Sequence, residues 1–249
     1  GNKGAENKFN REYGVYYTPR DIVHHMCQQS LIYHMRNELK GIVKKEDIEN
    51  FITYVEEFRE YEGILFENQE RIEKDEQKII EYKSKLPESI CKNAKLIDEK
   101  LANIKVCDPA VGSGAFLVGM MHEILKLRLA LSPFAKDNGR TPYDIKRECI
   151  ENSLYGVDID PGASEITKLR MWLSLVVDEE DIRKIRPLPN LDYKVIRGDS
   201  LLGVKTDLFN AESFRKLEKL KPLYLNETNP SKKQEYKKQI DRLIKEITR

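Results

Sequence analysis

Apolar residues in the first hundred positions recur at the spacing of α-helices. One set predicts a helix that ends near residue 40: Ile22, Val23, Met26, Leu31 and Ile32. Thr18 is the expected N-cap of this helix, and Pro19 suits its first turn. From 44 to 100 the chain is rich in Glu, Lys and Tyr, which predicts an inserted helical hairpin with a solvated charged face. Its apolar stripes are Phe51, Tyr54, Val55 and Phe58, and then Leu65, Ile72 and Ile79.

From residue 104 the pattern changes to short apolar segments that alternate with amphipathic helices. Strands are expected at 104–107, 154–158 and 193–197, and helices at 115–131, 143–152 and 162–178. The last of these helices is expected to bury an apolar face of Ile166, Leu169, Trp172, Leu173 and Val176. The alternation predicts an α/β fold with a parallel, doubly wound sheet and helices on both of its faces.

Composition divides the chain into regions of different character. They are an N-terminal segment with its helix (1–43), the helical insertion (44–100), the α/β core (101–204) and a Lys-rich helical segment (205–249). The net charge of +1 excludes a uniformly basic protein that coats nucleic acid, although residues 205–249 hold 12 Lys and Arg against 7 Asp and Glu. The chain begins with Gly rather than Met, which indicates a trimmed or internal piece of a longer polypeptide.

Other features of the composition restrict the class of protein further. No run of 18 apolar residues and no charged-then-apolar leader occurs, so we expect a cytoplasmic protein. The 4 cysteines form no C-x-x-C pair, which favours reduced thiols over a zinc site or a disulfide framework. The 4 histidines lie on predicted helices without a carboxylate or cysteine at ligand spacing, so no metal site is expected.

An acidic residue stands at the carboxyl end of each predicted strand: Asp108, Asp158 and Asp199. The carboxyl ends of parallel strands meet at one edge of a sheet, where ligands bind. The loop after the first strand is glycine-rich, and Gly112 and Gly114 allow the backbone to approach a ligand closely. The third glycine of the dinucleotide pattern is absent, and no Lys follows as in phosphate-binding loops, so a nucleoside triphosphate is not expected.

These acids indicate the chemistry of a ligand. Asp108, just before the loop, would repel a pyrophosphate and favour a positive charge. Asp158 is placed to accept hydrogen bonds from a ribose diol, and Asp199 to accept one from an amine such as adenine N6. S-adenosylmethionine combines a ribose, an adenine and a cationic end without phosphates, and it fits this set. Structural explanations also exist, because Asp158 or Asp160 can cap the helix that begins at Pro161, and Asp199 can cap a local turn.

Four segments resemble the gamma-class adenine-N6 DNA methyltransferases, above all the methylase portion of type IIG restriction–modification enzymes and type I modification subunits. The segments are YYTPRDIV (16–23), VCDPAVGSGAFL (106–117), LYGVDIDPGASEITKLRMWLSL (154–175) and VIRGDSLL (195–202). The resemblance implies a Rossmann-like methyltransferase fold that binds S-adenosylmethionine. It also implies double-stranded DNA as a partner, together with a restriction or specificity subunit or a fused nuclease.

The resemblance assigns the methionine end of the cofactor to the first two segments. Tyr17, Thr18 and Pro19 would line the pocket there, and Asp108 would face the amino group of the cofactor. Phe116 would pack beside it. Close contacts from the glycine-rich loop would come from Ala110, Gly112, Ser113 and Gly114.

The adenosine end is assigned in the same way to the other two segments. Asp158 would hold the ribose hydroxyls, and Ile159 would lie against the adenine. Asp199 would bind the adenine amino group, while Ser200 or Leu201 would border the ring.

One departure from the family pattern concerns methyl transfer itself. Family members position adenine N6 with an Asn-Pro-Pro-aromatic loop, and no such tetrapeptide occurs in residues 1–249. Asn229-Pro230 continues with Ser231 and fails the pattern. We therefore expect no catalytic residue in this chain and a cofactor-binding part that is inactive alone. The alternatives are a non-catalytic scaffold or subunit-contact module of the same fold, and methylation of RNA or of protein glutamine.

Overall fold

The computed structural model describes residues 18–60, 86–135, 139–177, 179, 191, 193–201, 211–227 and 229–247. The chain divides into two units with a boundary between Gly198 and Asp199. Tyr17 and the apolar stripe Leu65, Ile72 and Ile79 lie outside the described residues. In the first unit the helices are α2 (Arg20–Glu38), α3 (Lys45–Thr53), α5 (Glu88–Lys92), α6 (Ala94–Asn103), α7 (Ala115–Ala135), α8 (Pro142–Asn152) and α9 (Pro161–Val176).

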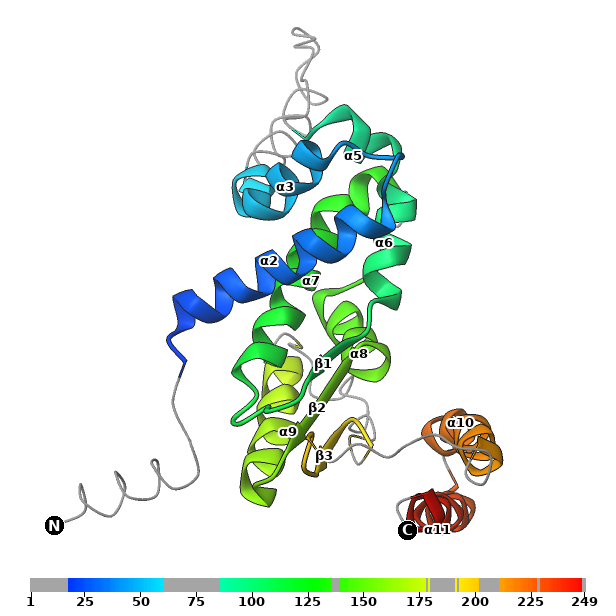
Figure 1. Ribbon diagram of the computed structural model, residues 1–249. Helices are drawn as coiled ribbons and strands as arrows, with labels where there is room; N and C mark the ends of the chain where they lie inside the picture. The colour runs from blue at the N-terminus through cyan, green and yellow to red at the C-terminus, as the bar shows by residue number, and fades with distance from the viewer. Residues whose placement is uncertain are drawn as a thin grey trace, which may run out of the picture. The chain divides into compact units, whose positions relative to one another are not determined.

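The sheet of the first unit is parallel and has the order β1-β2-β3 (Figure 1). Its strands are β1 (Val106–Asp108), β2 (Leu154–Asp158) and β3 (Val195–Arg197). Val106 pairs with Leu154, and Gly156 pairs with Val195. Helices α7 and α8 connect the first two strands, and α9 follows the second. The predicted α/β class with a parallel sheet is confirmed.

Within the described residues, helices cover one face of this sheet. Side chains alternate between faces along a strand, and Val106, Leu154 and Val195 on one face are buried. A Cβ placed on Gly156 of that face would come within 3.1 Å of Leu117, which identifies α7 as one of the covering helices. On the other face Ile196 is exposed. Among the described residues no helix covers this second face, so the expectation of helices on both faces stays a prediction.

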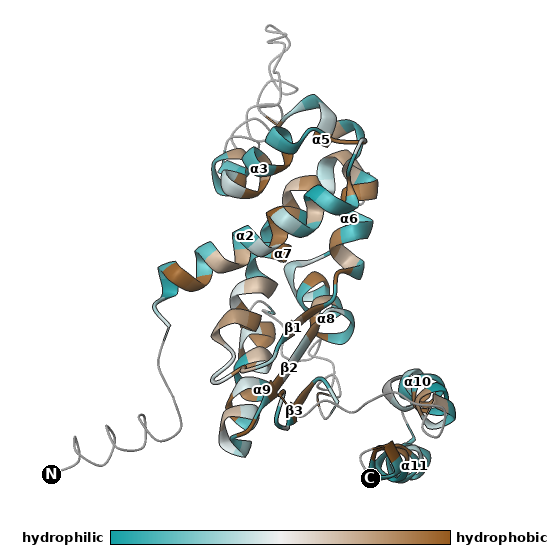
Figure 2. Cartoon of the chain, in the orientation of Figure 1, coloured by the Kyte–Doolittle hydropathy of each residue, from teal (hydrophilic) through white to brown (hydrophobic). Residues whose placement is uncertain are grey.

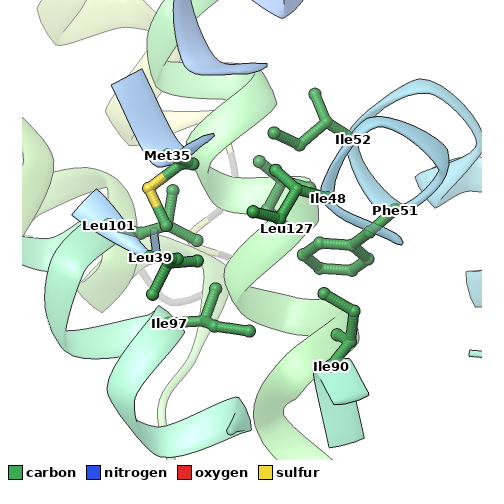
Figure 3. A pocket seen from close by; sticks show the side chains of 9 residues that line it. All are labelled: Met35, Leu39, Ile48, Phe51, Ile52, Ile90, Ile97, Leu101 and Leu127. Atoms are coloured by element: carbon green, nitrogen blue, oxygen red, sulfur yellow. The ribbon is translucent and has the colours of Figure 1, made fainter. Parts of the chain in front are cut away.

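A layer of helices packs beside the sheet and contains much of the apolar core. Helix α2 lies against α7, where the Cys27 thiol lies 3.6 Å from the carbonyl oxygen of Phe116 (Figure 1). Brown, hydrophobic colour marks β1 and β2 in Figure 2. A small apolar cavity remains inside the helical layer, lined by Met35, Leu39, Ile48, Phe51, Ile52, Ile90, Ile97, Leu101 and Leu127 (Figure 3).

Helix α3, within the predicted insertion, packs its apolar side against this core. Phe51 and Val55 of the predicted stripe are buried, and Phe58 is partly buried against the same core. Tyr54 is exposed, so its assignment to the stripe was wrong. The helix ends at Thr53 and Tyr54 is its C-cap, which explains why helical spacing fails there.

The beginning of α2 also differs from the sequence expectation. Pro19, not Thr18, is the N-cap residue, and no side chain caps the helix. The Pro19 carbonyl accepts the first helical hydrogen bond, from the Val23 amide at 3.1 Å. Thr18 therefore lies one residue outside the position from which its hydroxyl could cap the first turn.

The second unit contains an amphipathic pair of helices, α10 (Ala211–Asn226) and α11 (Pro230–Ile247). They pack against each other through buried residues that include Leu217, Tyr224 and Ile240. The Lys233 ammonium lies 5.6 Å from the centre of the Tyr224 ring and so links the helices. Teal, hydrophilic colour predominates on both helices in Figure 2, as expected for a Lys-rich segment.

A buried ionic cluster joins α6, α7 and α8 in the first unit. The Arg128 guanidinium, whose side chain is 2% exposed, donates to Asp98 at 2.9 Å and to Glu148 at 2.7 Å. Arg140 donates to the same Asp98 carboxylate at 2.9 Å. Burial alone would raise the pKa of Asp98, but the hydrogen bonds from Arg128 and Arg140 outweigh it and lower the pKa below 3.8. The cluster therefore keeps Asp98 ionised in the interior.

None of the helices in the described part of the chain combines the length and apolar character that crossing a bilayer requires.

Replacing Asp98 by Asn should lower the free energy of unfolding by about 3 kcal/mol at neutral pH, because Arg128 would stay buried without its main counter-charge. Urea unfolding measures this change, and Glu99→Gln, on the exposed neighbour in α6, is the matched control. In the native chain this contribution is present above the unfolded-state pKa of 3.8 and is lost as the pH falls through the lower folded-state pKa. Equal stability of the Asp98→Asn variant and the control would contradict the expectation.

Candidate cofactor site

The loop Asp108–Gly114 connects β1 to α7 and forms the centre of the candidate site. The Val111 amide donates to the Val157 carbonyl at 2.9 Å, and the Gly114 amide donates to the Val111 carbonyl at 2.8 Å. Gly112 and Gly114 have φ angles of +51° and +79°, in the left-handed region that favours glycine. The backbone at both positions thus has the positive φ angles that were expected from the two glycines.

The two sides of this loop differ in how much room they leave. A Cβ on Gly114 would lie 2.7 Å from the Cγ2 atom of Thr167 in α9, so that side is closed by packing. A Cβ on Gly112 would meet no described atom within 4 Å. The Gly112 side is therefore the one at which a ligand could approach the backbone.

Helix α9 also contacts the loop through hydrogen bonds. The Thr167 hydroxyl donates to the Gly112 carbonyl at 2.9 Å. The Arg170 guanidinium donates to both the carbonyl and the hydroxyl oxygen of Ser113, each at 2.9 Å. These side chains provide hydrogen-bond donors for the carbonyls of the partly buried residues Gly112 and Ser113.

Asp158, at the end of β2, links the neighbouring loops. Its Oδ2 atom accepts a hydrogen bond from the Gly112 amide at 2.8 Å, and its Oδ1 atom accepts one from the Asp160 amide at 2.9 Å. Its backbone carbonyl accepts from the Gly198 amide at 2.8 Å. Each carboxylate oxygen can accept more than one hydrogen bond, so Asp158 keeps capacity for a ligand hydroxyl.

Asp108 provides a second carboxylate close to the first. Its Oδ1 atom accepts a hydrogen bond from the Ala110 amide at 3.1 Å. Burial raises the pKa of Asp108 above its ordinary value of 3.8, the negative charge of Asp158 raises it further, and the bond from Ala110 opposes both. A cation beside this pair would relieve the repulsion, whereas a phosphate would increase it.

The residues after Asp158 begin α9. Ile159 is 61% exposed, which leaves its side chain available for contact. Asp160 is the N-cap, since its carboxylate accepts from the Gly162 amide at 2.8 Å and Pro161 fills the first helical position. Of the two acids that could cap this helix, Asp160 does so, and Asp158 is used between the loops.

The remaining predicted site residues have less defined surroundings. Phe116 is half-buried against the apolar core at the start of α7. Thr18 and Pro19 are exposed at the beginning of α2. Asp199, Ser200 and Leu201 belong to the second unit and are exposed, and the Leu201 amide donates to the Asp199 carboxylate at 2.9 Å in a local turn. The structure thus brings together the loop residues with Asp108 and Asp158.

Thr167 and Arg170 were not identified from the sequence. The prediction of which face of α9 is buried was wrong, because Ile166, Leu169 and Leu173 are each about half exposed. The buried face instead contains Ser164, Thr167, Met171 and Leu175. Part of this face lies against a polar loop backbone, so an apolar pattern could not reveal it. The available signal for these two residues was their polarity and their spacing of three on one helix, within the segment 154–175.

Comparison with known proteins relates this chain to the methylases of restriction–modification systems. Residues 81–188 match the model of the DNA-methyltransferase domain of MmeI, and residues 152–248 match that of the Eco57I restriction-modification methylase. The chain is 33% identical over 193 residues to a putative type II restriction enzyme and methyltransferase of Methanocaldococcus jannaschii. The aligned region covers 76% of this chain and 14% of the relative.

A second relative is the type II restriction enzyme and methyltransferase RM.Eco57I of Escherichia coli. It is 29% identical over 134 residues, which cover 47% of this chain and 13% of the relative. The chain therefore corresponds to a small part of the length of these curated relatives.

Alanine substitutions at the two glycines should separate backbone strain from steric overlap. Gly112→Ala should cost about 1 kcal/mol of unfolding free energy, since only its φ angle is unfavourable. Gly114→Ala should cost about 3 kcal/mol, because the new methyl group also overlaps Thr167. Gly139→Ala, at a position with neither constraint, is the control for urea unfolding. Equal losses at Gly112 and Gly114 would refute the packing difference.

Proposed function

Because this chain belongs to the restriction–modification DNA methylases, we propose that it is the S-adenosylmethionine-binding part of an adenine-N6 methyltransferase. The observation that carries the proposal is the loop Asp108–Gly114. Its backbone is open on the Gly112 side and lies beside two interacting carboxylates. This combination suits a ligand that is cationic and lacks phosphates.

In this proposal the first strand and its loop hold the methionine end of the cofactor. The cofactor itself supplies a methyl group on a positively charged sulfur. The Asp108 carboxylate pairs with the amino group, and Gly112 lets the backbone approach closely. Thr18 and Pro19, with Tyr17 outside the described residues, would complete this end, with Phe116, Ala110, Ser113 and Gly114 around it.

The second strand and the residues after the third hold the adenosine end. Asp158 accepts the ribose hydroxyls with its remaining acceptor capacity, and the exposed Ile159 side chain lies against the adenine. Asp199 accepts from the adenine amino group, with Ser200 or Leu201 at the ring edge. These roles follow the resemblance of the sequence motifs, and binding experiments on single residues test them.

The function of the larger system is a further part of the proposal. The relatives are named as combined restriction enzymes and methyltransferases. We accordingly propose double-stranded DNA as the substrate and a restriction nuclease, fused or separate, as the functional partner. No Asn-Pro-Pro-aromatic tetrapeptide occurs in residues 1–249. This chain alone is therefore expected to bind the cofactor without transferring its methyl group to DNA.

Calorimetric titration with S-adenosylmethionine and with S-adenosylhomocysteine tests the proposed binding directly. Asp158→Ala should weaken both ligands about tenfold to hundredfold, because charge-assisted bonds to the ribose are lost. Glu165→Gln removes an exposed acid of α9 that bonds only Lys168 among the described contacts, and it should leave the affinity unchanged. Absence of heat from the folded native chain would refute the cofactor assignment and favour a scaffold role.

The pH dependence of binding tests the role of Asp108. Because burial and the charge of Asp158 raise the pKa of Asp108 in the free chain, Asp108 keeps its proton to a higher pH than an ordinary aspartate does, and a cationic ligand selects the ionised form. Affinity should therefore rise as the pH increases through the raised pKa, with release of a proton that titrations in two buffers of different ionisation enthalpy detect. Asp108→Asn should remove this dependence. If the Asp108→Asn variant keeps it, another group is responsible.

A further inference from the structure

Helix α9 supports the glycine-rich loop on its Gly114 side, where Thr167 leaves no room for a side chain. We propose that Thr167 and Arg170 are positioning residues that fix the Gly112–Gly114 backbone for the cofactor, an inference that rests on the proposed function. Neither side chain has to touch the cofactor, since both act through carbonyl groups of the loop. The proposal adds residues outside the set that the sequence motifs suggested.

Thr167 contacts the loop in two ways at once. Its side chain is fully buried, and its hydroxyl donates to the Gly112 carbonyl at 2.9 Å. Its methyl group occupies the space next to Gly114, where a Cβ would lie only 2.7 Å away. The hydroxyl therefore sets the direction of one peptide group, and the methyl group fills the space beside the following turn.

Arg170 fixes the next peptide group from the same helix. One of its guanidinium nitrogens donates to the Ser113 carbonyl and to the Ser113 hydroxyl, both at 2.9 Å. Two consecutive carbonyls, of Gly112 and Ser113, are thus held toward α9. Because C=O and N–H point in opposite directions across a trans peptide, the Ser113 amide is turned away from α9.

The helix that carries these residues is itself held at several points. Asp160 caps its first turn. Near its end the Ser174 hydroxyl is 2.9 Å from His122 of α7, and its carbonyl accepts from Lys146 of α8 at 2.9 Å. A support that is tied to neighbouring helices can hold the loop in one conformation before the ligand arrives, which reduces the entropy lost on binding.

Binding measurements on matched variants of the full chain test the proposal. Thr167→Val keeps the shape but removes the hydroxyl, and it should weaken S-adenosylmethionine about threefold to tenfold. Arg170→Met removes both bonds to Ser113 and should weaken it about tenfold. Thr167→Ser keeps the hydroxyl and should restore affinity to within about twofold of the native chain. Lys168→Met removes a positive charge from the same turn of α9 and should have no effect.

The stoichiometry and amide exchange separate positioning from general damage. Positioning variants should bind one ligand per chain at lower affinity, and amides of Gly112–Gly114 should exchange faster in the free protein, with the exchange of the α7 amides unchanged. A fall in stoichiometry at unchanged affinity would indicate partial unfolding and overturn the proposal. Native-like affinity of both the Thr167→Val and the Arg170→Met variants would overturn it while leaving the proposed function intact. If the folded native chain binds no ligand, the proposed function fails and this inference fails with it.

Discussion

The loop between β1 and α7 can keep its conformation only if its backbone polar groups find partners, since buried carbonyls and amides without hydrogen bonds are costly. Val157 provides a carbonyl for the Val111 amide, and Asp158 provides a carboxylate for the Gly112 amide. Thr167 provides a donor for the Gly112 carbonyl. The second strand and the helix that follows it therefore determine the shape of the first loop.

This dependence also explains the electrostatics of the site. The Gly112–Asp158 bond brings the second acid to the loop, and the charge of Asp158 then acts on Asp108. The same bond that fixes the backbone thus places two carboxylates together. A ligand that carries a positive charge gains from both, and the relation of the chain to restriction–modification methylases is consistent with such a ligand.

The sequence was sufficient wherever structure follows from local signals. The second strand, the helix that begins after Gly114 and the cap of α9 next to Pro161 match the observed elements, and the first and third strands overlap the predicted ranges, because strand propensity, glycine conformations and N-caps are encoded within a few residues. The two interacting acids were likewise identifiable, since each directly ends a strand. The position of Asp199 relative to them remains a prediction.

The sequence was insufficient where tertiary contacts decide. The buried side of α9 faces both core and loop backbone, so Thr167 is fully buried while Leu169 is exposed. Hydrophobic periodicity predicts which face of a helix packs against apolar residues, but it cannot predict that one side of the helix will pack against backbone carbonyl groups. In the same way, Thr18 had the chemistry of a cap, but the backbone of Pro19 began the helix.

The close approach of Gly114 to Thr167 also limits the order in which a lineage could change these positions. A smaller residue at 167 is compatible with glycine at 114, whereas any side chain at 114 conflicts with threonine at 167. Reduction at 167 must therefore come first, and the left-handed backbone at 114 still disfavours the second change. A substitution at 167 followed by one at 114 is therefore far more accessible than the same two substitutions in the reverse order.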